Sequence, residues 1–165
     1  MMKTQNLVKL SLLAAISLVI FVIETRIPNL IPIPGVKLGL ANIVTEWSVY
    51  NCKAHETAML LLTRIVLGAI FCGTVLSFIY SFCGAAACFI VCIVIKRLIP
   101  RDKMWLMSVI GAIFHNLGQI TAATIVMRTT AVLVYLPILM VSGIIAGLFC
   151  GLGALFVDKR LHKLR

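Results

Sequence analysis

The chain has 165 residues, of which 62% are hydrophobic and only 12% are charged, with a mean hydropathy of +1.12. Soluble domains contain about 25% charged residues, so this composition argues against a water-soluble globular protein. The formal charge of +10 would favour a nucleic-acid partner in a soluble chain, but the basic residues here lie between apolar runs and fit the cytoplasmic loops of a membrane protein.

The first apolar run, residues 7–23, predicts an uncleaved transmembrane helix, because a charged segment rather than a small-residue cleavage site follows it. Residues 24–37 contain three prolines and a glycine. These residues exclude a continuous helix and predict an ordered outer loop. The next run, residues 38–50, is short and contains Glu46, which predicts a tilted or partly buried helix.

Residues 57–95 contain a single charged residue, Arg64. As one helix they would reach about 58 Å, roughly twice the thickness of a bilayer core. They therefore predict two spans, at about 56–72 and 75–95, joined by a tight turn.

The basic segment 96–103 contains the helix-stopping Pro100 and predicts a loop. Residues 104–127 predict a fifth span. Residues 129–157 predict a sixth, long enough to tilt or to kink at Pro137. A basic tail ends the chain.

Six spans place both termini on the same side of the membrane. With that side inside, eleven lysines and arginines fall in inner segments and three, Arg26, Lys37 and Arg128, in outer segments. This asymmetry predicts cytoplasmic termini. The fold class is therefore an all-α integral membrane protein of the cell membrane, one six-helix domain over residues 1–165.

Two groups of small residues predict close helix contacts. Gly143, Gly147 and Gly151 are spaced by four in the sixth span. They indicate packing either within the bundle or against a partner protein. Ser11 and Ala15, with Ala14 beside them, form a shorter pattern in the first span.

Polar residues inside a membrane usually face a cavity or a partner. His115, Asn116 and Gln119 lie near the middle of the fifth span, and His115 and Gln119 share a face. Glu46 is expected to approach Arg64, either as a structural ion pair or to handle a substrate or a proton. His115 lacks further ligands nearby in the sequence, so we expect no metal site there.

The six cysteines include no C-x-x-C pair, and five of them lie in apolar runs, so we expect small apolar residues rather than metal ligands. On the outer face, the three cations and the neutral Asn42 suit a small anionic or polar ligand. The alternative for these cations is interfacial snorkelling.

Four segments together resemble the Gx transporter family, whose members are labelled heptaprenyl diphosphate synthase component I. They are KLGLANIVT (37–45), TRIVLGAIFCGT (63–74), SFIYSFCG (77–84) and GAIFHNLGQI (111–120). The family is similar to the substrate-binding S components of energy-coupling factor (ECF) transporters. The resemblance implies six helices with both termini inside. It also implies docking through small residues of the first helix, here Ser11, Ala14 and Ala15, onto a membrane coupling protein driven by two ATPases.

The resemblance implies that the chain captures a small cofactor or a quinone- or isoprenoid-type precursor from outside and delivers it inward. No Walker motif is present, so the energy would come from the partner ATPases. We expect no bound cofactor. The predicted substrate-binding residues are Arg26, Lys37, Asn42, Arg64, His115, Asn116, Gln119 and Arg128.

Prenyl-chain elongation needs Mg²⁺ held by clustered carboxylates, and Asp102 and Asp158 are the only aspartates. The sequence therefore predicts that this chain is not the catalytic subunit of a synthase. Two alternatives stay open. One is a non-catalytic membrane subunit associated with a heptaprenyl diphosphate synthase. The other is a small membrane enzyme with His115 as its acid/base and Arg64 as an anion clamp.

Overall fold

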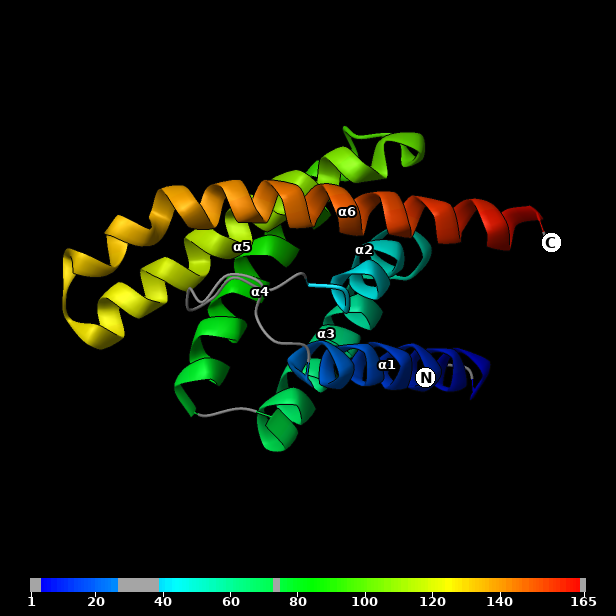
Figure 1. The fold of residues 1–165 in the computed structure, drawn as a ribbon. Coiled ribbons are helices and arrows are strands. Elements are labelled where there is room, and N and C mark those ends of the chain that lie inside the picture. The colour runs from blue at the N-terminus through cyan, green and yellow to red at the C-terminus, as the bar shows by residue number, and fades with distance from the viewer. Residues whose placement is uncertain (1–3, 27–38, 73–74, 164–165) are drawn as a thin grey trace.

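The computed structural model describes residues 4–26, 39–72 and 75–163, and this part of the chain consists of helices joined by short turns, without a strand (Figure 1). It forms six α-helices and two short 3₁₀ helices. They are α1 (Thr4–Arg26), α2 (Asn42–Asn51), α3 (Ala54–Cys72), α4 (Val75–Ile95), η1 (Arg101–Lys103), α5 (Met104–Met127), η2 (Thr130–Tyr135) and α6 (Leu136–Lys163).

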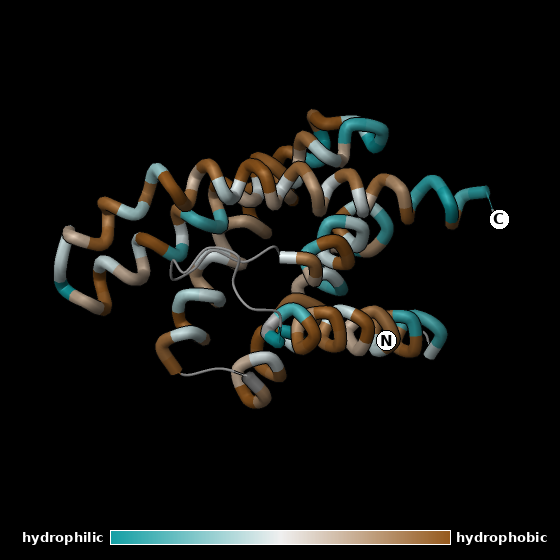
Figure 2. Tube along the Cα trace, in the orientation of Figure 1, coloured by the Kyte–Doolittle hydropathy of each residue, from teal (hydrophilic) through white to brown (hydrophobic). Residues whose placement is uncertain are grey.

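Five of these helices, α1, α3, α4, α5 and α6, are long and apolar enough to cross a membrane. Large apolar side chains, among them Ile70, Ile90 and Ile145, are exposed on their outer faces. Figure 2 shows this apolar character along the helices and hydrophilic residues at the first turns of α1 and the last turns of α6. Exposed apolar surface on this scale is what lipid tails cover, which indicates a multi-pass membrane protein.

The helix α2 is shorter than the other five. Its 10 residues reach about 15 Å, half of a bilayer core. The helix begins only at Asn42 because Gly39 has a φ of +69°, a left-handed conformation that interrupts a helix and favours glycine. The segment predicted as a span at 38–50 therefore contains a helix that does not cross a bilayer alone. Residues 27–38 lie outside the described residues.

The chain around Gly39 is fixed by side chains from two other helices. Its N–H donates a hydrogen bond to the Glu24 carboxylate at the end of α1, and its carbonyl accepts one from Cys150 Sγ of α6, at 3.2 Å. Glu24 is buried and attaches the beginning of α2 to α1.

The helices α1 and α3 run parallel to each other. Asn6 Nδ2 near the start of α1 donates to Glu56 Oε1 near the start of α3, at 3.2 Å. Further along both helices, a Cβ at Gly68 would lie 2.9 Å from the Phe21 ring. The start of α3 therefore lies at the same end of the bundle as the start of α1. The first residues of α1 and the last turns of α6 lie toward the same end of the molecule (Figure 1).

The last helix differs from its prediction at both ends. The predicted span at 129–157 divides into η2 and α6, and α6 continues through the basic tail to Lys163. Pro137 lies in the first turn of α6, where its missing N–H would have no helical partner in any case. Pro137 therefore helps to start the helix, and the expected kink at this residue is not observed.

Gly143, Gly147 and Gly151 of α6 lie against α5, and all three are buried. A Cβ at Gly147 would lie 2.9 Å from Val109 Cα, and one at Gly151 would lie 2.5 Å from Trp105 Cα. Gly143 faces the amide of Asn116. The absence of side chains lets the two backbones approach closely, so this stripe packs α6 inside the bundle.

Candidate functional site

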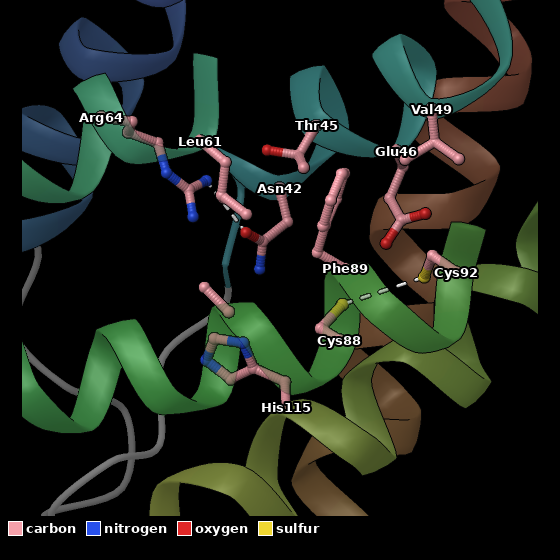
Figure 3. Close-up of a pocket in the computed structure, with 11 residues that line it drawn as sticks. Asn42, Thr45, Glu46, Val49, Leu61, Arg64, Cys88, Phe89, Cys92 and His115 are labelled. Atoms are coloured by element: carbon pink, nitrogen blue, oxygen red, sulfur yellow. Dashed lines mark hydrogen bonds between the residues drawn. The ribbon is translucent and has the colours of Figure 1, made fainter. Parts of the chain in front are cut away.

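A small cavity lies between α2, α3, α4 and α5 (Figure 3). Its volume is about 20 Å³, enough for a water molecule but far below the several hundred Å³ of a typical small-molecule site. It is lined by Asn42, Thr45, Glu46, Val49, Leu61, Arg64, Ala85, Cys88, Phe89, Cys92 and His115.

Arg64 of α3 provides the positive charge of the cavity. Its residue surface is only 9% exposed, and its NH1 group donates a hydrogen bond of 2.9 Å to Asn42 Oδ1. Asn42 is its one hydrogen-bond partner among the described residues, whereas a guanidinium has five N–H donors. The remaining donors can hold a carboxylate or a phosphate, for which the planar guanidinium is well suited.

His115 of α5 borders the same space (Figure 3). It lies with Gln119 against Gly84 of α4. A Cβ at Gly84 would be 3.1 Å from His115 Nε2 and 2.6 Å from Gln119 Cγ. A side chain at residue 84 would displace both polar groups, so this glycine makes room for them.

The structure separates the remaining predicted binding residues from this cavity. Asn116 is buried, and its Nδ2 donates to the carbonyl of Leu139, which joins α5 to α6. Arg26 ends α1 and Arg128 caps α5 with a φ of 51°. Both are exposed and neither lines the cavity. Lys37 lies outside the described residues.

The expected ion pair between Glu46 and Arg64 is not formed. Both side chains line the cavity, but Arg64 contacts Asn42, which precedes Glu46 by one turn of α2. One turn of α2 therefore separates Glu46 from the residue that Arg64 contacts, which is enough to keep the two charges apart. Glu46 is 4% exposed, and its Oε2 has no hydrogen-bond partner.

Glu46 instead lies beside two cysteines of α4. One ligand-type atom each from Glu46, Cys88 and Cys92 lies within 4.8 Å of the other two. The four-residue spacing of the cysteines predicts that they share one face of a helix, and this signal was present in the sequence. The approach of Glu46 depends on how α2 packs against α4, which no sequence pattern indicated.

On α1, the small residues expected to contact a partner are accessible. Ser11 and Ala15 are exposed, and Ala14 is half-buried. They are therefore not used for packing within the described bundle, in contrast to the glycines of α6.

Polar side chains join several helices at the end where α1 begins and α6 ends. Arg101 Nε lies 3.1 Å from Asp158 Oδ2, and Asn51 Nδ2 donates to Asp158 Oδ1 at 2.9 Å. Lys96 Nζ donates to the carbonyl of Val49 at 3.2 Å. These contacts link the ends of α2, α4 and α6.

The family model for heptaprenyl diphosphate synthase component I matches residues 13–157, which include every residue lining the cavity. The chain belongs to this family. No curated protein and no solved structure matches the chain significantly. This component I family member is thus a helical protein with five helices suited to a membrane, and its cavity lies in the part that the family shares.

Proposed function

We propose that this component I chain is the substrate-binding S component of an ECF-type importer. It captures a small cofactor or a quinone- or isoprenoid-type precursor from outside the cell and delivers it inward, with energy from partner ATPases. The observation that carries the proposal is the buried Arg64, which lines an internal cavity beside Asn42 and His115.

A buried cation in a membrane bundle is costly and usually marks a substrate or ion pathway. Among the described residues no carboxylate forms an ion pair with Arg64. The anionic group of a substrate, a carboxylate or a phosphate, would supply the missing charge. Because the cavity is small, we propose that α2 moves away from α3 when a whole ligand enters.

In this proposal the chain crosses the membrane six times, and the predicted span at 38–50, which contains α2, is the second crossing. Both termini are cytoplasmic. The end of the bundle where α1 begins and α6 ends carries Lys96, Arg101 and the basic last turns of α6. The positive-inside rule assigns such a basic end to the cytoplasm.

The proposed partners are a membrane coupling protein and two ATPases, and the proposed docking surface is the exposed Ser11–Ala15 face of α1. The test is a mild-detergent pull-down of the tagged full-length chain from its native membrane, with the partners identified by mass spectrometry. Recovery of a coupling protein and two ATPases would support the proposal.

A pair of variants makes this test specific to α1. Ala15→Trp should remove the partners, because a large side chain prevents close approach of the helices. Ile16→Trp, on the neighbouring face of the same helix, replaces a residue that is already large and exposed and should retain them. Equal recovery with both variants would reject this docking surface.

The second candidate is a non-catalytic membrane subunit associated with a heptaprenyl diphosphate synthase, which the description of the family favours. The same pull-down separates the two candidates. A soluble prenyl synthase recovered without ATPases would favour the second and contradict the first.

A further inference from the structure

We propose that Glu46, Cys88 and Cys92 form a binding site for a thiophilic divalent cation of the zinc type. The cysteine spacing had predicted only small apolar residues. The structure instead places two sulfurs and one carboxylate at one end of the cavity, away from the Arg64–Asn42 contact (Figure 3).

The distance between the two sulfurs fits a tetrahedral metal site. Cys88 Sγ and Cys92 Sγ are 3.9 Å apart. Two Zn–S bonds of about 2.3 Å at a tetrahedral angle separate the sulfurs by about 3.8 Å. A linear arrangement with bonds of the same length would need about 4.6 Å. The spacing therefore favours a tetrahedral ion over a linear, two-coordinate one.

Gly111 of α5 shows that the three groups converge on one space. A Cβ built at Gly111 would lie 2.8 Å from Cys92 Sγ, 3.0 Å from Cys88 Sγ and 3.5 Å from Glu46 Oε1. Three potential ligand atoms thus surround the region beside this glycine. An alanine at residue 111 would place a methyl group among them.

Glu46 provides the evidence that this cluster is more than a cysteine pair. Its side chain is buried, and Oε2 has no hydrogen-bond partner. A buried polar atom without a partner is costly, and coordination of a cation would satisfy it. Carboxylates and thiolates are both ordinary zinc ligands, and three protein ligands leave a fourth position open for water.

The charges also balance. Binding displaces the protons of the two thiols and that of the buried Glu46 carboxyl, which pass to solvent, so that two thiolates and one carboxylate hold the divalent cation. The resulting net charge of −1 lies in the same cavity as the positive charge of Arg64. A nearly neutral assembly is what a low-dielectric interior tolerates.

The first experiment measures Zn²⁺ bound to the tag-free, full-length chain in detergent with a non-thiol reductant, after removal of metal and dialysis against Zn²⁺. We expect about one ion per chain. Glu46→Gln and Gly111→Ala should each lower the affinity by about 10-fold or more. Cys83→Ser, on the same helix but outside the cluster, should leave it unchanged. No bound Zn²⁺, or equal affinity in all variants, would overturn the proposal.

A second measurement uses the unmodified chain and so avoids any folding defect of the variants. Alkylation of each cysteine is followed by mass spectrometry with Zn²⁺ and with a chelator. Zn²⁺ should slow alkylation of Cys88 and Cys92 by about 10-fold, because a coordinated thiolate is protected, and leave Cys83 unaffected. Equal rates at Cys88 and Cys92 in both conditions would reject the site. Co²⁺ in place of Zn²⁺ should show the absorption of a tetrahedral thiolate complex.

Discussion

The hydrogen bond between Arg64 and Asn42 joins α3 to the first residue of α2 and occupies part of the guanidinium that lines the cavity. The contact therefore has two consequences. It partly satisfies a buried cation, and it holds α2 close to α3 in the conformation with a small cavity.

Asn42→Ala should lower the free energy of unfolding by about 1–3 kcal/mol, because it leaves a buried guanidinium without its hydrogen-bond partner. Asn42→Asp has nearly the same shape and supplies a negative charge beside a buried cation. We expect this variant to be at least as stable as the parent chain. Thermal unfolding in a single detergent compares the three proteins.

An Asn42→Ala variant as stable as the parent chain would show that the hydrogen-bond donors of Arg64 do not depend on Asn42. Asn42→Asp should also weaken the capture of an anionic substrate, since its carboxylate competes for the same guanidinium. Normal substrate uptake by Asn42→Asp, with normal expression, would contradict the proposed role of Arg64.

Gly151→Ala should destabilise the bundle by about 1–3 kcal/mol, because the added methyl group would lie 2.5 Å from Trp105 Cα, a backbone atom that cannot turn aside. Gly153→Ala is the matched control on the same helix. Its methyl group would meet the end of the Ile43 side chain at 3.0 Å, and this flexible group can move. Thermal unfolding should therefore show a clearly larger loss of stability for Gly151→Ala than for Gly153→Ala. Equal losses would contradict the observed packing of α6 on α5.

Hydrophobic run lengths and basic loops predicted most of the helices. The described bounds of α3, α4 and α5 lie within two residues of the predicted spans, because a bilayer requires long, apolar helices. The run at 38–50 was harder to interpret. Its hydrophobicity resembled that of a span, but Gly39 interrupts the helix before Asn42, and the buried Glu46 belongs to a short helix packed inside the bundle.

The candidate site was predicted in part. Arg64 and His115 were selected as polar residues inside apolar runs and Asn42 as a neutral residue of the outer face, and all three line one cavity. Their role in substrate binding stays a prediction. The pairing of Glu46 was wrong, because it depends on the register between α2 and α3, and a shift of one turn exchanges one partner for another. The cysteines were interpreted one by one, whereas their chemistry depends on Glu46 and Gly111 from other helices.

Asp158→Ala should lower the free energy of unfolding by about 1–3 kcal/mol. The Asp158 side chain is 6% exposed and contacts Arg101 and Asn51, so its loss removes an ion pair and a hydrogen bond that attach α6 to these two residues where the helix ends meet. Asp102→Asn is the control, since Asp102 is next to Arg101 in sequence but is exposed. We expect that variant to change stability by less than about 0.5 kcal/mol. A similar loss in both variants, measured by chemical or thermal unfolding, would indicate a general charge effect rather than this contact.

Cys52, between α2 and α3, offers a test of the proposed orientation. It is half-buried beside Lys9 of α1, at the end where α1 begins. A membrane-impermeant maleimide should label it in inside-out vesicles and not in right-side-out vesicles, if this end is cytoplasmic. Burial raises the pKa of the Cys52 thiol above its ordinary value, against the opposing charge of Lys9. The thiolate fraction at neutral pH is therefore low, and labelling should accelerate as the pH rises from 7 to 9.

The matched control for orientation is Arg128→Cys, at the exposed end of α5. This residue should show the opposite sidedness, with labelling in right-side-out vesicles only. Quantifying the peptide that contains Cys52 by mass spectrometry keeps the other five cysteines in place. Labelling of Cys52 and of residue 128 from the same side would contradict a bundle that crosses the membrane between them, and labelling of Cys52 from outside alone would invert the proposed topology.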